Sequence, residues 1–293
     1  LAIKILYLSY KDDSGGAFIG AKRLHHALRI QGIDSILLVR RKVSIDPSVV
    51  QYRVKVSNFE KRFNNWIISK MPQWRKEFMG TNSFNLRHTG VHQIINQSDA
   101  DCVIMHWVGN DTISIRELGL ITKPIIWRLA DMWAFSGCRH YSEDFELETL
   151  EEPPSKSHKN IDQLIWGRKN KLWNNLNLRM VCGSEWLSSK VRSSKILGKY
   201  DTFTIPSSLN TEIFSPAGNL NHCIPLGRNE CRLLFGANCA INDSRKGFDL
   251  LINALSLLKE NRPKLKFELK LFPEPKIFLS SIPNVTPAPV SAL

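Results

Sequence analysis

Residues 127–141 form the densest group of side chains that could bind a ligand: a short apolar run leads into aromatic residues, a carboxylate, an arginine and a histidine. Asp131 could accept hydrogen bonds from hydroxyl groups. Trp133 and His140 stand close to it in the sequence, and aromatic faces suit the C–H surfaces of sugar rings. A core patch beneath a long loop explains the same composition equally well.

His106 and Trp107 form a second group of this kind, with Asn110 and Asp111 just after them. The apolar residues that precede His106 predict a strand that ends at this point. In open α/β sheets, ligands bind beyond the carboxyl ends of the strands, so this position favours a binding role. A buried aromatic patch remains the alternative here too.

A glycine pair, Gly15 and Gly16, follows the first apolar run of the chain. Glycine lets backbone N–H groups approach a phosphate or a sugar closely, and the N-terminus of a following helix favours an anion. A tight turn would use the same residues. The GxGxxG spacing of dinucleotide enzymes is absent, which argues against NAD or FAD.

Arg245 and Lys246 directly precede Gly247, where a helix is predicted to begin. Two cations at a helix N-terminus oppose the helix macrodipole unless an anion lies between them. The pair could therefore clamp a diphosphate. A solvated basic turn is the commoner fate of such a pair.

An alternation of strands and helices must bring these groups together. Residues 3–9 are typical of a strand, a helical pattern then runs to Gly32, and residues 36–39 are again apolar. Strand, glycine turn, helix and strand make a βαβ unit, which requires a parallel sheet. The pattern recurs, with strands expected at 102–106, 125–129, 180–182, 232–236 and 267–271, and helices around 91–95, at 162–173 and at 247–259.

The 293 residues carry a formal net charge of +13, which favours anionic partners: phosphates, acidic lipid headgroups or nucleic acid. No nucleic-acid-binding motif is recognisable and the basic residues are dispersed, so we do not expect a nucleic-acid partner. The six cysteines contain no CxxC pair, which fits a reducing cytoplasm and argues against a zinc site or disulfide scaffold. Residues 53–76 combine basic side chains with one apolar helical face, which could rest on an anionic membrane or pack on the domain.

The order and spacing of these motifs over residues 3–260 resemble a family 4 (group 1) glycosyltransferase of the GT-B fold, in which two Rossmann-like domains face each other across a cleft. The resemblance is carried by residues 14–17, 127–141, 182–187, 205–216 and 245–251. Each motif is moderately specific, and their ordered occurrence makes the set strong.

This resemblance implies a retaining hexosyltransferase that uses a nucleotide-diphosphate sugar as co-substrate, with no metal and no other cofactor. Gly15 and Gly16 would line the cleft near the donor phosphate. Lys246, supported by Arg245, would neutralise the diphosphate as the leaving-group charge grows. Asp131 and Lys246 are the candidate catalytic residues, and the acceptor-side candidates are His106, Trp107, Trp133 and His140.

Three departures from the family pattern bear on activity. Ala130 stands where many relatives have a histidine that hydrogen-bonds the donor sugar, although other relatives also have alanine. Ala237 replaces an arginine near the end of the first strand of the second domain, a loss for which Arg245 could compensate. The E-x7-E segment that holds the donor sugar and ribose lies beyond the last residue of the chain.

We therefore expect an α/β protein of GT-B type with a complete N-terminal Rossmann-like domain (1–215), a linker (216–230), the start of a nucleotide-sugar-binding domain (231–272) and an irregular proline-rich tail (273–293). The expected function is glycosyl transfer to a glycan or lipid-linked acceptor in polysaccharide or glycoconjugate biosynthesis, in the cytoplasm or on the inner face of the membrane. The alternative is an inactive truncated fragment or pseudoenzyme that binds only sugar or acceptor. A basic nucleic-acid-binding protein is the weaker alternative.

Overall fold

The computed structural model describes residues 3–13, 15–54, 82–141, 161–215, 230–237, 244–272 and 285–287. The chain divides into two compact units, Leu1–Asn210 and Thr211–Leu293, which are described separately below. Most of the basic amphipathic segment 53–76 lies outside the described residues, so its two interpretations stay open.

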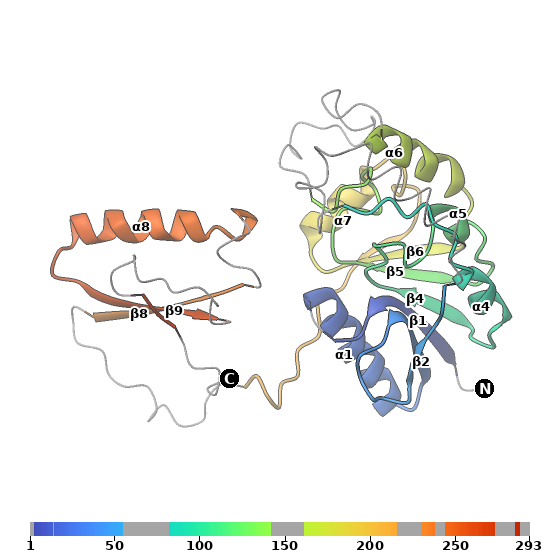
Figure 1. The fold of residues 1–293 in the computed structure, drawn as a ribbon, viewed down its shortest axis with the longest axis horizontal. Helices are drawn as coiled ribbons and strands as arrows, with labels where there is room; N and C mark the ends of the chain where they lie inside the picture. Colours follow the sequence, from blue (N-terminus) through green and yellow to red (C-terminus); the bar gives the residue numbers. More distant parts are fainter. Residues whose placement is uncertain are drawn as a thin grey trace. The chain divides into compact units, whose positions relative to one another are not determined.

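A seven-stranded parallel sheet forms the centre of the first unit (Figure 1). In sheet order its strands are β3 (Val49–Gln51), β2 (Asp34–Arg41), β1 (Lys4–Lys11), β4 (Cys102–Met105), β5 (Ile125–Leu129), β6 (Leu178–Cys182) and β7 (Thr202–Thr204). The strand order therefore reverses between β1 and β4. In open α/β sheets, ligands bind at the carboxyl ends of the strands where such a reversal occurs.

Helices cover both faces of this sheet: α1 (Gly16–Ile30), α4 (Val91–Gln97), α5 (Ile115–Leu118), α6 (Ile161–Leu172) and α7 (Glu185–Arg192). Leu24 and Leu28 of α1 pack against the buried cluster that contains Tyr7 and Leu37. The other four helices contribute to a larger core on the opposite face, which includes Ile95, Leu118, Ile165 and Val191. Two apolar layers around a parallel sheet confirm the expected Rossmann-like α/β architecture.

Four short elements of this unit were not expected at these residues from the sequence: β3, α5, α7 and β7. Helix α5 has only four residues, but Ser114 and Glu117 form a complete capping box at its start. Ser114 accepts a hydrogen bond from the Glu117 N–H, and the Glu117 carboxylate accepts one from the Ser114 N–H. The Ser-x-x-Glu spacing was therefore a usable signal for this helix.

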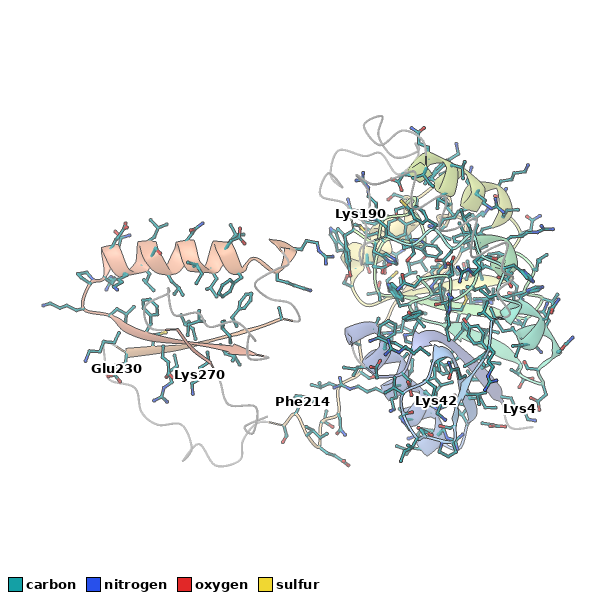
Figure 2. The ribbon with its side chains drawn as sticks, viewed as in Figure 1. Lys4, Lys42, Lys190, Phe214, Glu230 and Lys270 are labelled. Atoms are coloured by element: carbon teal, nitrogen blue, oxygen red, sulfur yellow. The ribbon has the colours of Figure 1, made fainter. Side chains whose placement is uncertain are left out.

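The second unit contains a three-stranded parallel sheet in the order β10 (Val285–Pro287), β9 (Lys266–Phe272) and β8 (Glu230–Gly236). Helix α8 (Phe248–Asn261) packs on one face of this sheet (Figure 2). Phe248 and Leu255 of the helix are buried against Leu269 and Leu271 of β9. Leu234 of β8, by contrast, is 66% exposed. Strand β10 falls within residues 273–293, so the prediction that this stretch holds no strand is wrong there.

Among the described residues, no helix combines the length and the apolarity that are needed to cross a bilayer.

Candidate functional site

The predicted glycine turn lies at the start of α1, immediately after β1. Gly15 is the N-cap residue, with φ of 97°, and no described side chain caps this end of the helix. A Cβ atom at Gly15 would lie 3.1 Å from Cδ2 of Phe18, whereas one at Gly16 would meet nothing within 4 Å. The N–H groups of Phe18 and Ile19 already donate to the Gly15 carbonyl, so those of Gly16 and Ala17 are the ones at this helix start that suit an anion.

Three aromatic rings form what we call the aromatic corner beside this turn: Tyr10, Phe18 and Trp107. The Trp107 ring centroid lies 5.8 Å from that of Tyr10 and 5.5 Å from that of Phe18. The Tyr10 N–H donates to the Trp107 carbonyl at 3.3 Å, which extends the β1–β4 pairing past the end of β4. The corner therefore lies at the switch point between β1 and β4, and the half-buried Trp107 can offer an aromatic face to a sugar ring.

A chain of hydrogen bonds connects Asp131, His140 and Ser83 behind the aromatic corner. Asp131 Oδ2 lies 2.6 Å from His140 Nδ1, and His140 Nε2 lies 2.7 Å from Ser83 Oγ. All three residues are buried. The Trp107 ring stacks on His140 with centroids 5.0 Å apart, so the chain fixes the ring on which Trp107 rests.

The Asp131 carboxylate also accepts a hydrogen bond from the backbone of its own loop. Its Oδ1 accepts the Trp133 N–H at 3.0 Å, and its Oδ2 contacts His140. Both oxygens are therefore engaged by the protein, and Asp131 is only 8% exposed. Its geometry fits a residue that positions the loop, a role that the sequence pattern around Asp131 did not indicate.

Lys169 holds the same loop from α6. Its ammonium donates to the carbonyls of Trp133, Ser136 and Gly137, and it lies 3.7 Å from the centroid of the Trp133 ring. Burial lowers the pKa of Lys169 well below its usual value. Lys169 was not singled out from the sequence, although its spacing of four residues from Ile165 places it on the apolar face of the helix.

The loop after β4 is held in an unusual backbone conformation. Asn110 and Asp111 have φ of 53° and 52°, values that are costly for residues other than glycine. Asn85 fixes the loop, because its Nδ2 donates to the carbonyls of Val108 and Ile113 at 2.6 Å and 2.8 Å. Asn85 is fully buried and was not identified from the sequence.

His106 lies beneath the site and not on its surface. Among the described residues its buried Nε2 has no hydrogen-bond partner, and burial lowers its pKa to about 3. Its ring stacks on Tyr7 with centroids 5.6 Å apart. A cavity of about 10 Å³ is lined by His106, Trp107, Asp131 and His140, among others. That volume suits one water molecule and not a sugar, so any sugar must lie outside it.

The structure thus brings together the five residues expected near the sugar, His106, Trp107, Asp131, Trp133 and His140. It buries four of them, however, and leaves Trp107 as the partly exposed member. The core-patch alternative therefore describes Trp133, His106 and His140 well.

The basic pair of the second unit forms a short 3-10 turn, η3 (Ser244–Lys246), ahead of α8. Gly247 is the N-cap of α8 and adopts the left-handed conformation with φ of 70°. Arg245 and Lys246 are both exposed. Their position at the start of a 14-residue helix is compatible with the proposed diphosphate clamp.

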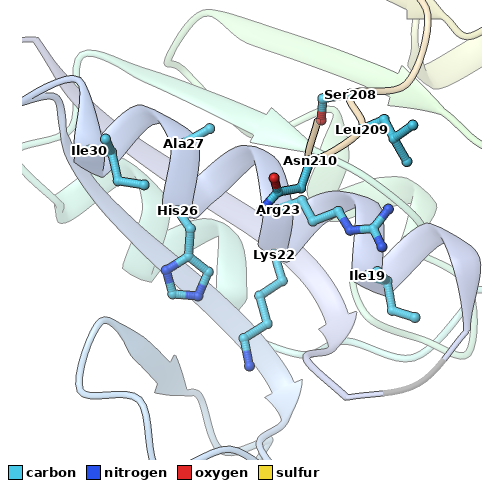
Figure 3. Close-up of a pocket in the computed structure, with 9 residues that line it drawn as sticks. All are labelled: Ile19, Lys22, Arg23, His26, Ala27, Ile30, Ser208, Leu209 and Asn210. Atoms are coloured by element: carbon cyan, nitrogen blue, oxygen red, sulfur yellow. The ribbon is translucent and has the colours of Figure 1, made fainter. Parts of the chain in front are cut away.

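A separate groove of about 420 Å³ runs along the outer face of α1 (Figure 3). Its described lining contains none of the predicted site residues and consists of Ile19, Lys22, Arg23, His26, Ala27, Ile30, Ser208, Leu209 and Asn210. His88, His92 and Glu117 are a group of described side chains whose spacing could hold a metal ion.

No model of a protein family matches the sequence, and no curated protein matches it either. Solved structures resemble the fold, and two glycosyltransferases are among them. A glycosyltransferase from Rickettsia africae ESF-5 is 14% identical, with a TM-score of 0.51 over 92% of this chain and 60% of that chain. WaaG, a glycosyltransferase involved in lipopolysaccharide biosynthesis, is 12% identical, with a TM-score of 0.47 over 91% of this chain and 62% of that one.

The chain therefore spans less than two thirds of the length of either structure. At 14% identity the likeness to the Rickettsia africae structure concerns the fold, and it agrees with the GT-B type expected from the motifs. The chain has the Rossmann-like α/β fold that is found in a solved glycosyltransferase.

Proposed function

We propose that this chain belongs to an enzyme that transfers a glycosyl group from a nucleotide-diphosphate sugar to an acceptor hydroxyl. One observation carries the proposal: the glycine turn and the aromatic corner meet at the switch point between β1 and β4. An anion-binding helix N-terminus beside an aromatic face matches the two halves of such a donor, a phosphate and a sugar.

In this proposal the chain's residues divide the work as follows. Gly15 and Gly16 give the donor phosphate access to the backbone of α1. Arg245 and Lys246 neutralise the diphosphate, whose negative charge grows as the glycosidic bond breaks. Asp131 acts as a positioning residue, because both of its carboxylate oxygens are already engaged.

The finer features of the proposal follow the family resemblance. They are retention of the anomeric configuration, transfer of a hexose, independence of a metal, and a role in polysaccharide or glycoconjugate biosynthesis. A lipid-linked acceptor on an anionic membrane would also account for the net charge of +13. Sedimentation with anionic vesicles, and its absence with neutral ones, is the expected result.

Binding without transfer is a second candidate function, and two observations favour it. Ala130 is exposed at the position where many relatives carry the donor-binding histidine. The neighbouring Asp131 is buried, and its carboxylate oxygens contact Trp133 and His140 of the same loop. A chain of this kind could bind a nucleotide sugar or an acceptor glycan without catalysing transfer.

Nucleotide release distinguishes the two functions. The protein is incubated with UDP-sugars and GDP-sugars, and free nucleotide is measured. Water can replace the acceptor hydroxyl in this assay, so hydrolysis of the donor also releases nucleotide. Transfer predicts release by the wild type and a loss of at least about tenfold in Trp107→Ala, the magnitude expected when a sugar-stacking ring is removed.

Trp186→Ala is the matched control, because Trp186 is 56% exposed on α7 and belongs to no part of the proposed site. It should release nucleotide as the wild type does. A thermal shift with nucleotide but no release would favour binding alone. Neither release nor thermal shift would overturn both transfer and the binding of a nucleotide sugar.

A further inference from the structure

We propose that His88, His92 and Glu117 form a binding site for a divalent transition metal of the Zn²⁺ class, separate from the sugar site. The three side chains come from the segment before α4, from α4 itself and from α5. Their potential ligand atoms all lie within 4.8 Å of one another. Two imidazoles and one carboxylate are a ligand set that zinc uses in proteins.

The distances from the two histidine nitrogens to the Glu117 carboxylate are close to those between ligands of one metal ion. Nδ1 of His92 lies 3.1 Å and Nδ1 of His88 lies 3.3 Å from the same oxygen, Oε1 of Glu117. Metal–ligand bonds of about 2.0–2.1 Å in a tetrahedral site place adjacent ligand atoms about 3.3–3.4 Å apart. The two histidine–carboxylate separations are therefore close to those of a tetrahedral site, and the whole group lies within 4.8 Å.

Several hydrogen-bond donors hold the Glu117 carboxylate in place. Ser114, Thr89 and Gly90 all donate hydrogen bonds to the buried Glu117 carboxylate. Backbone donors fix the carboxylate, with the Gly90 N–H at 2.6 Å from Oε1 and the Thr89 N–H at 3.0 Å. Such outer donors commonly orient metal-binding carboxylates.

Without a metal, the contacts have a simpler explanation. An ionised carboxylate only accepts, so Nδ1 of His92 carries the proton of its hydrogen bond to Oε1, and Nδ1 of His88 lies near the same oxygen. Ligation through Nδ1 moves that proton to Nε2 of the same ring, which is a tautomer change without net proton release from a neutral imidazole. The His88 side chain is 62% exposed, so the ion can enter from solvent and a water can complete its coordination.

A metal at this place would tie the start of α4 to α5. Helix α5 directly follows the loop that carries His106 and Trp107. The ion would therefore stabilise the first unit and fix the far end of a loop that borders the candidate sugar site.

Cobalt(II) titration of the full chain tests the proposal, because visible absorption reports both the ligand geometry and the ligand type. We expect one equivalent to bind with tetrahedral d–d bands and without a thiolate charge-transfer band, which excludes the cysteines as ligands. His88→Ala, an exposed change that preserves the fold, should weaken binding by about tenfold or more.

His26→Ala is the matched control, since His26 is a partly exposed histidine that pairs with Asp46 elsewhere in the unit. It should bind cobalt like the wild type. Zinc should also raise the unfolding midpoint of the wild type and of His26→Ala, but not that of His88→Ala. Equal cobalt affinity in His88→Ala and the wild type, or no tetrahedral bands in the wild type, would overturn the proposal.

Discussion

Replacing Lys169 with methionine should destabilise the first unit strongly, because this buried ammonium holds the loop at residues 131–140. It donates to the carbonyls of Trp133, Ser136 and Gly137, the last two at 3.2 Å and 2.7 Å. Methionine keeps the aliphatic stem and therefore leaves little empty volume. It removes the donor from three acceptors at once.

The magnitude follows from these contacts. Each carbonyl that loses its donor costs about 1 kcal/mol or more. Loss of the cation–π contact with Trp133, at 3.7 Å, adds about 1 kcal/mol. Removing a charge that is costly to bury offsets part of this loss, as the lowered pKa of Lys169 indicates. The expected net decrease in the free energy of unfolding is about 2–4 kcal/mol.

Tryptophan fluorescence during urea unfolding measures this decrease in the first unit alone, because all eight tryptophans precede residue 211. Lys171→Met is the matched control, since Lys171 is exposed two residues further along α6. It should change the free energy of unfolding by no more than about 0.5 kcal/mol. Equal unfolding midpoints for Lys169→Met and Lys171→Met would refute the role of Lys169.

Two further predictions concern the first unit. Gly15→Ala should lower the free energy of unfolding by about 1–3 kcal/mol, because φ is 97° and the new Cβ would press on Phe18. Gly16→Ala should leave it unchanged or raise it by up to about 1 kcal/mol. Equal urea midpoints for the two variants would contradict this contrast. Burial lowers the pKa of His106 to about 3 and that of His25 to about 4, from a usual value of 6.5. The unfolded chain therefore takes up these protons first, and the free energy of unfolding should fall as the pH drops from about 6.5 toward 4, by up to about 1.4 kcal/mol per pH unit for each histidine. His25→Gln should flatten that slope, and an unchanged slope would count against the assignment.

The sheet was predictable because its central strands are buried on both faces. Such strands appear as continuous apolar runs, as in β4, which was predicted at 102–106 and is buried in all but its first residue. Elements of three or four residues, such as β3 and α5, are too short to show a period. The strand β10 escaped prediction because its proline-rich surroundings carry no strand pattern, although a proline is tolerated in a strand with a free side.

The candidate site was predictable in its residues but not in their roles. Trp107, Asp131 and His140 were selected because they follow predicted strands, and the structure places them together. Ser83, which contacts His140, lies 57 positions away in the sequence with no motif around it. Burial of Lys169 likewise depends on carbonyls that a distant loop supplies. Such partners are set by tertiary structure, which local patterns do not encode.

Release of nucleotide from a UDP-sugar or GDP-sugar by the wild type and by Lys246→Gln is the most direct test of the proposed glycosyl transfer. We predict release by the wild type, a strong loss in Lys246→Gln, and wild-type release by Lys259→Gln, a change in the last turn of α8, away from the basic pair. Absence of release with every donor, or undiminished release by Lys246→Gln, would contradict the proposed transfer.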